Sequence, residues 1–452
     1  MMKVPMNQNV LFTFFGRMTQ AIIKRERPFV IGITGSVGKT SVKQLCAAVL
    51  DANDPSRHIR VTPKNYNNEL GLPFTILNID APGRLPWKWA EAVWTALWYG
   101  LGLGKTGIKT ALLEMGADKP GDLAHLVAMA PPDISIITGV TPGSSTMIPV
   151  HAAQYATPDD VAKEKSTLAT CLPSGGTLIL NADDPRVYEM RHMTRAHVML
   201  YGRRAGCDVH LLETRVRVEE GTHGAIPLGL EVHVERFQKR ETFFLQGVFG
   251  ESYAYSACAA IALAEAMDVS GDLAERLRFF TPAPGRTRII PGIKYTTLYD
   301  DSYNASPVAV LSAIRDLVKT ELQPGQRRVA CLGEMRELGA GAEQAHREIA
   351  AEVARLGIDL FVPCGIFAAA MKDAARSAGM PDERIHASDD TPEAGLFIQS
   401  WIKPGDVILA KASQGGHETK GVRMERVIKE LMADPMRAGD LLCRQEERWK
   451  QV

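Results

Sequence analysis

The stretch from residue 28 to residue 41 constrains the fold more than any other part of this chain. An apolar run, Phe-Val-Ile-Gly-Ile-Thr, leads into Gly-Ser-Val-Gly-Lys-Thr at 35–40 and then into helix-like sequence. A strand, a glycine-containing loop and a helix in this order predict a phosphate-binding loop in an α/β domain. The strict motif has a glycine five residues before Gly38, where this chain has Ile33. The alternative interpretation is a loop whose sequence matches this motif by chance.

The residue types in this loop suit a bound nucleoside triphosphate and magnesium. Backbone N–H groups at the start of the helix can hold phosphate oxygens, because they have no partners inside the helix. Lys39 would place a positive charge on the outer phosphates, and the Thr40 hydroxyl would be a magnesium ligand. The expected nucleotide-binding residues of the loop are Gly35, Ser36, Val37, Gly38, Lys39, Thr40 and Ser41.

The composition limits the kind of protein that this chain forms. The chain has 452 residues, which is enough for two or three domains with well-buried cores. Lys plus Arg and Asp plus Glu both number 52, so no nucleic-acid partner is expected. The seven cysteines are scattered and form no Cys-x-x-Cys pair. Neither a zinc site nor a disulfide framework is indicated, and we expect a cytoplasmic protein.

Short apolar runs alternate with helical periodicity along most of the chain, which predicts an α/β fold with parallel sheets. The expected strands are 29–34, 110–113, 134–138, 177–180, 297–299, 328–332, 360–362 and 407–410. From 207 to 249 the sequence is alternating and turn-rich, so we expect a small antiparallel patch there. A Pro/Gly-rich segment at 281–287 marks the main boundary. We therefore expect a short helical segment at 1–27 and two domains, at 28–285 and 286–452.

Polar residues follow several of these expected strands, where open α/β sheets bind their ligands. Asn67 and Asn68 lie in an amide-rich turn, and Glu114 comes directly after an apolar run. A carboxylate beside a phosphate-binding loop can hold magnesium, although an exposed loop acid is an equally simple interpretation. His151 and Lys165 are 14 residues apart, and a lysine in helix-like sequence of this kind usually faces solvent.

Together these clusters carry a resemblance that no single cluster carries. They are, in chain order, Thr-Gly-Ser-Val-Gly-Lys-Thr at 34–40, Asn-Asn-Glu-Leu-Gly-Leu-Pro at 67–73, Glu-Met-Gly-Ala at 114–117, His151, Lys165, Asn-Ala-Asp-Asp at 181–184, Pro-Gly-Arg at 284–286, Asp-Asp-Ser-Tyr-Asn-Ala at 300–305, Leu-Gly-Glu-Met-Arg-Glu-Leu-Gly at 332–339 and Leu-Ala-Lys-Ala-Ser at 409–413. This pattern resembles the Mur ligase family over about residues 28–430. The resemblance implies a P-loop central domain with a parallel sheet and a small antiparallel patch, followed by a Rossmann-like C-terminal domain.

The family resemblance implies an ATP-dependent ligase that forms an amide bond through an acyl phosphate and releases ADP. The motifs at 300–307 and 332–339 are most similar to the branch that adds D-alanyl-D-alanine to a muramoyl-tripeptide precursor in peptidoglycan synthesis. Two alternatives stay open: a ligase for another carboxylate substrate, and an ATP-binding module that regulates without ligating. About 33 residues precede the loop motif, so we expect the family's usual N-terminal UDP-binding domain to be absent.

The resemblance also implies roles for individual residues. Thr40 and Glu114 match the ligands of one Mg²⁺. His151 matches a ligand of a second Mg²⁺, and Lys165 matches a lysine that the family carbamylates to help hold it. The expected catalytic residues are Lys39, His151, Lys165 and Arg286.

Three further expectations concern the nucleotide and the substrates. Arg286 matches the arginine that reaches the γ-phosphate, and Asp301 matches a residue near the ribose. We expect substrate contacts from Asn67, Asn68 and Asn304.

Two segments concern the outside of the molecule. The apolar patch at 10–15 is too short to span a bilayer. We expect a short docking helix there, and a membrane-surface anchor is the alternative. Four of the six tryptophans lie between 87 and 98, with Trp87, Trp94 and Trp98 near one helical face. We expect this face to pack in the core or against another domain, and a membrane interface or partner groove is the alternative. We expect a monomer.

Overall fold

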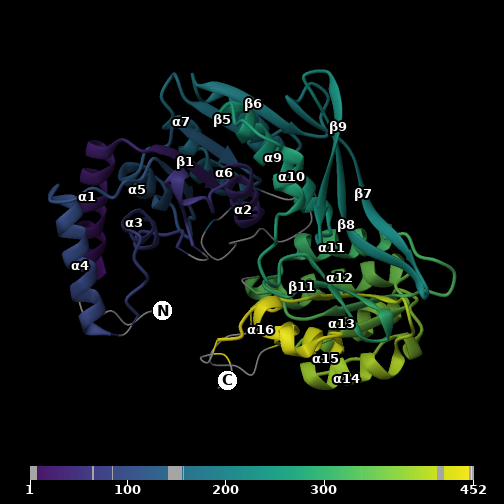
Figure 1. Ribbon diagram of the computed structural model, residues 1–452. Helices are drawn as coiled ribbons and strands as arrows, with labels where there is room; N and C mark the ends of the chain where they lie inside the picture. The colour runs from purple at the N-terminus through teal and green to yellow at the C-terminus, as the bar shows by residue number, and fades with distance from the viewer. Residues whose placement is uncertain are drawn as a thin grey trace.

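The computed structural model describes residues 8–63, 66–83, 85–140, 155, 157–336, 338–414, 422–446 and 449. Two β-sheets organise these residues into an upper and a lower body (Figure 1). The chain builds the upper body first and then passes into the lower body, with its last described residues back at the junction of the two. The α/β class expected from the alternating sequence pattern is confirmed.

The first sheet contains β1 (Phe29–Thr34), β2 (Ile59–Val61), β3 (Thr110–Glu114), β4 (Ile134–Ile137), β5 (Thr177–Asn181), β6 (His197–Gly202), β7 (Val209–Gly221), β8 (Gly224–Arg236) and β9 (Lys239–Gln246). Its strand order is β2-β3-β1-β4-β5-β6-β7-β8-β9. Pairing is parallel from β2 through β6 and into the start of β7, and antiparallel from β7 to β9. The predicted parallel strands and the antiparallel patch are confirmed.

Helices cover both faces of the parallel part of this sheet. They are α1 (Gln8–Glu26), α2 (Lys39–Val49), α3 (Gly71–Leu77), α4 (Pro86–Gly100), α5 (Asp122–Met129), α6 (Pro158–Lys165), α7 (Thr167–Thr170), α8 (Pro185–Glu189), α9 (Glu251–Ala266) and α10 (Leu273–Arg278). Along β1, Val30 packs into a core shared with α1, α3, α4 and α5, whereas Ile31 and Ile33 pack against α2 and α9. Burial on both faces explains why these strands read as continuous apolar runs.

The second sheet contains β10 (Arg288–Pro291), β11 (Thr297–Asp301), β12 (Arg328–Leu332), β13 (Leu360–Pro363) and β14 (Val407–Lys411), in the order β10-β11-β14-β12-β13. The helices of this body are α11 (Pro307–Lys319), α12 (Ala342–Arg355), α13 (Ala368–Ser377), α14 (Thr391–Trp401), α15 (Met424–Leu431) and α16 (Ala438–Leu441). The first three share one core and α14 and α15 share the other. The four strands predicted here are confirmed, while the domain boundaries at 27/28 and 285/286 stay predictions.

The long β7–β8 hairpin of the first sheet reaches the second body at its tip. The Gln326 side chain donates from Nε2 to the Gly405 carbonyl (2.6 Å) and to the Ala225 carbonyl (3.3 Å). Beside it, His223 stacks on Tyr295 with 4.3 Å between ring centroids. The two bodies are therefore joined at a second place besides the covalent linker.

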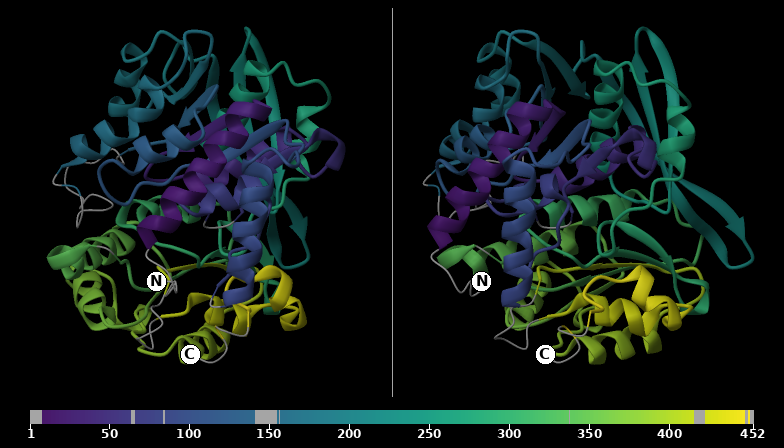
Figure 2. Two further views of the ribbon diagram at one scale, coloured as in Figure 1. Left: turned by 90° about the vertical axis from the view of Figure 1, so that its left-hand side faces the viewer. Right: turned by 60° about the vertical axis from the view of Figure 1, so that its left-hand side comes forward.

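The N-terminal helix α1 packs against the first sheet, as expected of a docking helix. Leu11, Phe15 and Ile22 are buried in the same core as the neighbouring strands. The two further views show α1 and α4 side by side at the surface of the upper body (Figure 2). In the part of the chain that the structure describes, no helix is long and apolar enough to cross a membrane.

The prediction that the tryptophan face of α4 packs in a core is wrong. Trp87, Trp94 and Trp98 are 65%, 66% and 43% exposed. The buried face of α4 consists instead of Trp89, Ala92, Ala96 and Gly100. Small residues on that face let α1 come close, since a Cβ at Gly100 would lie 2.4 Å from the Met18 sulfur. The opposite face, which holds the three tryptophans, is therefore turned outward.

We predict that removing one tryptophan of α4 strongly lowers the stability of the protein and that removing another has almost no effect on it. Trp89→Ala removes a buried indole that packs edge-on to Phe74, and it should lower the free energy of unfolding by about 3–5 kcal/mol. Trp94→Ala should change it by less than about 0.5 kcal/mol, because Trp94 is exposed. Chemical denaturation followed by circular dichroism measures both, and equal effects would contradict the orientation of α4.

Candidate functional site

The loop between β1 and α2 has a backbone that only glycine allows at its first position. Gly35 has a φ of 147°, and a Cβ there would lie 2.1 Å from Thr138 Oγ1. The next residue, Ser36, donates its N–H to the Gly139 carbonyl (2.7 Å). The loop is thus held against the end of β4, and its glycine replaces the one that the strict motif has at position 33.

The N-terminus of α2 is open to an anion. Gly38 precedes the helix with a φ of 81° and offers no side-chain cap, so the first N–H groups of the helix have no side-chain acceptor at the cap. The hydroxyl oxygen of Ser36 is buried, and the structure gives it no hydrogen-bond partner. A phosphate group at this point would satisfy both, because helix N-termini favour negative charge.

Lys39 lies over the loop, where it would contact the outer phosphates. Its ammonium donates to the Gly35 carbonyl (2.6 Å). Burial lowers the pKa of Lys39, and the nearby Arg286 lowers it further, while Glu114 acts in the opposite direction. Lys39 and Arg286 are therefore close enough to repel each other, and an anion between them would relieve that repulsion.

Glu114 ends β3 directly beside α2. Thr40 Oγ1 donates to both of its carboxylate oxygens (3.2 and 3.3 Å), and Asn67 Nδ2 lies 3.5 Å away. Burial would raise the pKa of Glu114, but the charges of Lys43 and Lys39 outweigh burial and lower it. The carboxylate is therefore ionised at neutral pH, and the interpretation of Glu114 as an exposed loop acid is wrong.

Thr40 and Glu114 together fit a magnesium ion by the chemistry of their donors. A hydroxyl and an ionised carboxylate, with phosphate and water oxygens beside them, are the oxygen ligands that Mg²⁺ prefers. Among the residues that the structure describes, no group of three or more His, Cys, Asp and Glu side chains is placed to hold a metal.

Lys43 is a site residue that the motifs did not indicate. Its ammonium lies 2.8 Å from Glu114 Oε2, and both side chains are almost completely buried. The signal was present in the spacing, because Lys43 comes four residues after Lys39 and therefore lies on the same side of α2, one turn further on. Lys43 holds the carboxylate ionised and fixes its orientation toward Thr40.

Lys165 does not face solvent, contrary to the usual behaviour of a lysine in such a helix. It is 1% exposed at the end of α6, a helix that Thr157 and Asp160 cap reciprocally. Burial, and next the charge of Lys39, lower the pKa of Lys165 to about 7. Lys165 is therefore in the electrostatic range of Lys39, whereas its expected companion His151 lies outside the described residues.

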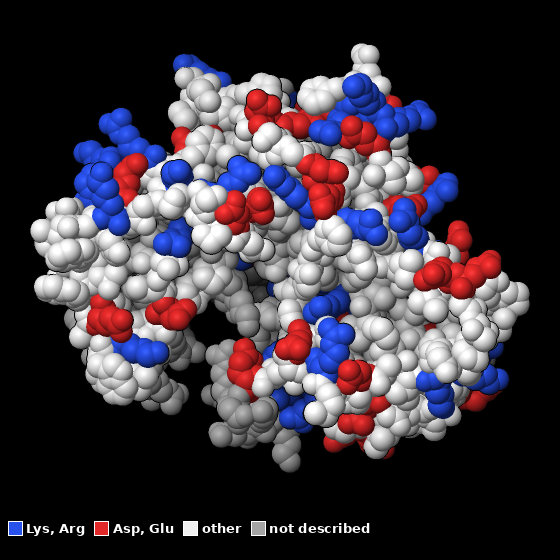
Figure 3. Space-filling model, in the orientation of Figure 1, with Lys and Arg blue, Asp and Glu red and all other residues white. Residues whose placement is uncertain are grey.

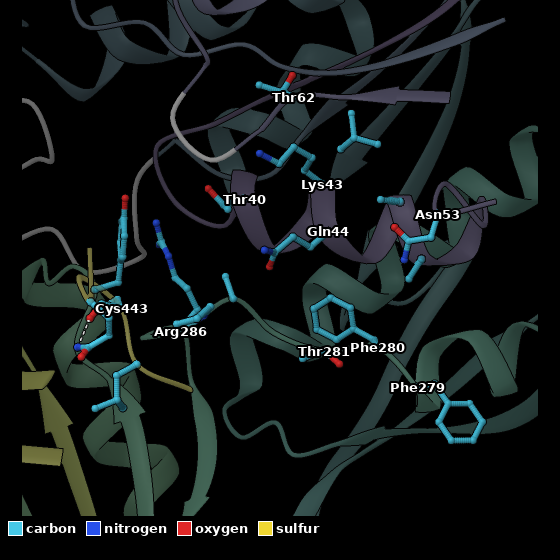
Figure 4. A pocket seen from close by; sticks show the side chains of 18 of the residues that line it. Thr40, Lys43, Gln44, Asn53, Thr62, Phe279, Phe280, Thr281, Arg286 and Cys443 are labelled. Carbon is cyan, nitrogen blue, oxygen red and sulfur yellow. Dashed lines mark hydrogen bonds between the residues drawn. The ribbon is translucent and has the colours of Figure 1, made fainter. Parts of the chain in front are cut away.

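Arg286 reaches the site from the linker between the two bodies. Its guanidinium lies 4.3 Å from the centre of the Tyr303 ring. The adjacent linker is fixed because Gly285 donates its N–H to Asp300 (3.1 Å) and accepts a hydrogen bond from the Tyr303 N–H (2.9 Å). Figure 4 shows Arg286 pointing from the linker toward Thr40 on α2.

A cavity of about 1280 Å³ lies between these elements. Thr40, Lys43 and Gln44 line it from α2, Arg286 from the linker, and Tyr303 from the end of β11. Further lining residues are Phe279, Phe280, Thr281, Cys443, Arg444 and Trp449, which come from the segment after α10 and from the C-terminal end of the described chain. A cavity of this size, with phosphate-binding groups at one end, has room for a nucleotide.

The structure does not bring every expected residue to this cavity. Asp301 forms an ion pair with Lys411, which also donates to the Asn304 carbonyl (2.9 Å). Asn68 uses its side-chain oxygen to accept the Gly71 N–H (3.0 Å) at the start of α3. The ribose contact of Asp301 and the substrate contacts of Asn67, Asn68 and Asn304 stay predictions.

The comparisons with known proteins agree with this geometry. The Mur ligase middle domain matches residues 33–264, and the glutamate ligase domain of Mur ligases matches residues 285–414. The UDP-N-acetylmuramoyl-tripeptide–D-alanyl-D-alanine ligase of Mycobacterium bovis is 30% identical over 404 residues, covering 85% of this chain and 70% of that protein.

Two solved structures have the same fold. MurF from Acinetobacter baumannii matches with a TM-score of 0.69 and 23% identity, over 93% of this chain and 80% of that one. MurF ligase from Thermotoga maritima in complex with ADP matches with a TM-score of 0.68 and 22% identity, over 93% and 83%.

The structure has a phosphate-binding loop on a parallel sheet and a cavity between that sheet and a second α/β body. This arrangement is typical of an ATP-binding ligase. The share of the chain that these matches cover, and the sequence identity of the relatives, show the family of this protein. The chain belongs to the Mur ligase family.

We predict that Lys39→Ala reduces ATP turnover by about a hundredfold or more, because the transferring phosphoryl group loses a fixed positive charge. Phosphate release from ATP, with circular dichroism as a folding check, measures the effect. The matched control is Lys239→Ala, which removes an exposed lysine at the start of β9. Equal turnover in the two variants would remove the loop from the mechanism.

Proposed function

We propose that this protein is a cytoplasmic, ADP-forming ligase that joins D-alanyl-D-alanine to a muramoyl-tripeptide precursor, and that it works as a monomer. The observation that carries the proposal is the convergence of Thr40, Lys43 and Arg286 at one cavity between two α/β bodies. Glu114 contacts Thr40 and Lys43 directly behind this lining, and Lys39 acts on Glu114 electrostatically. The relatives that match over most of the chain carry the name of this activity.

The chemistry follows from the charges at the cavity. ATP gives its γ-phosphoryl group to the tripeptide carboxylate, and the amine of the dipeptide then attacks the acyl phosphate and displaces phosphate. Such phosphoryl transfer depends mainly on positioning and on neutralising phosphate charge. Lys39 and Arg286 supply positive charge from two different elements, so the phosphates are held from the loop side and from the linker side.

Thr40 and Glu114 would hold a Mg²⁺ ion that neutralises phosphate charge when it is bound. Lys43 keeps Glu114 ionised and correctly oriented through the 2.8 Å ion pair. A ribose contact through Asp301 requires that carboxylate to leave Lys411. We place this exchange in the closing motion of the two bodies, which in many enzymes completes the site around the substrate.

Lys165 is the residue that we propose to be carbamylated. A fully buried ammonium close to Lys39 is unfavourable, because both the missing water and the like charge oppose it. Reaction of the neutral amine with CO₂, with loss of one proton, converts this cation into a carbamate anion. The product attracts Lys39 where the ammonium repelled it, and it offers oxygen atoms for a second magnesium together with His151.

The substrate assignment predicts that phosphate release from ATP requires both a muramoyl tripeptide and D-alanyl-D-alanine. A panel assay tests it by pairing each carboxylate with several amines, including single D-alanine and L-alanine, and carboxylates unrelated to the cell wall. We expect phosphate release with the first pair to exceed release with any other pair by at least about tenfold. Preferential use of another pair would replace the substrate assignment while leaving the ligase chemistry intact.

The carbamate proposal predicts a pH-dependent modification of Lys165. With a pKa of about 7, the amine becomes neutral as the pH rises from about 6 to about 8, so carbamylation at a fixed CO₂ concentration should increase over that range. Carbon-13 NMR with labelled CO₂ measures it. Lys165→Ala should remove the signal and most turnover but keep ATP binding.

The matched control is Lys163→Ala, because Lys163 is exposed on the same helix. This variant should keep both the carbamate signal and turnover. Full activity of the wild-type protein without any carbamate signal would contradict the proposal.

A further inference from the structure

One exposed face of α4 is largely apolar, with one carboxylate, Glu91, between Trp87 and Trp94. Trp87, Trp94, Trp98 and Leu101 follow one another at spacings of seven, four and three residues, which places them on one side of the helix. All four are exposed, with Leu101 at 66%. We call these four residues the tryptophan stripe. The opposite side of α4 is already occupied, because Trp89, Ala92 and Ala96 are buried in the core.

The apolar surface continues past the end of the helix. Leu103 is 61% exposed in the turn that follows α4, and Leu85 is exposed just before the helix. Single exposed apolar residues are normal on a protein surface, but a contiguous exposed apolar patch marks a site of contact. No segment that the structure describes covers it, as the exposed fractions show.

Positive charge gathers at one end of the stripe. Lys24, Arg25 and Arg27 at the end of α1 are exposed, as are Lys105 and Lys109 after α4. Figure 3 shows several Lys and Arg side chains at the upper left with an acidic side chain among them, and a largely white surface directly below them. These five residues form what we call the cationic end.

Hydrogen bonds fix the two segments of the cationic end side by side. Arg25 donates to the carbonyls of Tyr99 (2.5 Å) and Gly100 (3.2 Å). The one carboxylate in these segments, Glu26, accepts hydrogen bonds from the Thr106 N–H (3.1 Å) and hydroxyl (2.7 Å) and forms an ion pair with Arg25 (3.3 Å). Arg25 is therefore partly neutralised, and the outward charge of this end comes mainly from Lys24, Arg27, Lys105 and Lys109, which are exposed.

We infer that the tryptophan stripe and the cationic end dock this protein on the surface of an anionic lipid bilayer. Tryptophan prefers the headgroup level of a bilayer, where its ring is half apolar and its N–H finds a partner. Leu101 and Leu103 enter the acyl boundary beside it, and the five cations contact lipid phosphates. The contact is with one leaflet only, as for an amphipathic helix that lies in the interface.

The charge distribution favours a bilayer over a second copy of the chain. A second copy would have to offer acidic groups to the cationic end, but α4 carries a single carboxylate, Glu91. An anionic leaflet supplies phosphate groups at every position and apolar chains below them. It satisfies the aromatic and the cationic parts of the surface at once.

Vesicle sedimentation with the full chain tests the inference. The protein should bind vesicles of phosphatidylcholine mixed with phosphatidylglycerol, bind pure phosphatidylcholine vesicles much more weakly, and dissociate as salt is raised. Tryptophan fluorescence should shift to shorter wavelength on binding, and lipids brominated near the headgroup should quench it. The test does not depend on the identity of the ligase substrates.

Two sets of variants separate the two parts of the surface. Trp87→Ala with Trp94→Ala should lower partitioning onto the anionic vesicles about tenfold or more, and Lys24→Glu with Lys105→Glu should do the same. Phe237→Ala is the matched control, since Phe237 is an exposed aromatic residue in the β8–β9 turn. All variants should keep the circular dichroism spectrum of the parent protein.

Three results would overturn the inference. The first is no binding to anionic vesicles, and the second is binding that the tryptophan variants leave unchanged. The third is a dimer in analytical ultracentrifugation that Trp87→Ala with Trp94→Ala dissociates, without vesicle binding. In that case a second copy covers the stripe.

Discussion

The site depends on one buried carboxylate among several cations. Glu114 ends β3 within contact of Thr40, Lys43 and Asn67, and Lys39 and Arg286 act on it electrostatically. Glu114 alone does not neutralise Lys39, Lys43 and Arg286, so a polyphosphate bound among them would relieve their mutual repulsion. This imbalance explains why Lys39 donates to a loop carbonyl in the structure: its natural partner is an anion that arrives with the substrate.

The two bodies meet at the cavity, where Arg286 adds a further positive charge to the site. The linker brings Arg286 to the cavity and is itself tied to the end of β11 through Gly285. Gln326 and the tip of the β7–β8 hairpin form a separate contact far along the chain. Any rotation of one body against the other must therefore bend the linker while the hairpin contact breaks or acts as a pivot. Asp301, now paired with Lys411, lies on the part that would move.

Much of the fold and part of the site could be predicted from the sequence. Parallel strands were recognisable because burial on both faces leaves continuous apolar runs, and the P-loop because Gly35 and Lys39 fill fixed geometric roles. Lys43 and Lys165 show which site residues the sequence pattern does not predict. Both are lysines in amphipathic helices, and only the tertiary packing decides that Lys165 is buried and that Lys43 meets a carboxylate 71 residues further along the chain. The alternation of residue types in a helix does not contain that information.

The prediction for the tryptophan face of α4 was wrong for the same reason, because tertiary packing decided which face is buried. Side-chain size decided which face turned inward: Ala92, Ala96 and Gly100 allow α1 to approach, and bulky tryptophans would not. The outward stripe lies on one side of the first sheet, whereas α2 and the nucleotide cavity lie on the other side. A bilayer that holds the stripe would thus leave the cavity and the junction of the two bodies open to solvent. Docking and ligation therefore place no conflicting demands on the fold.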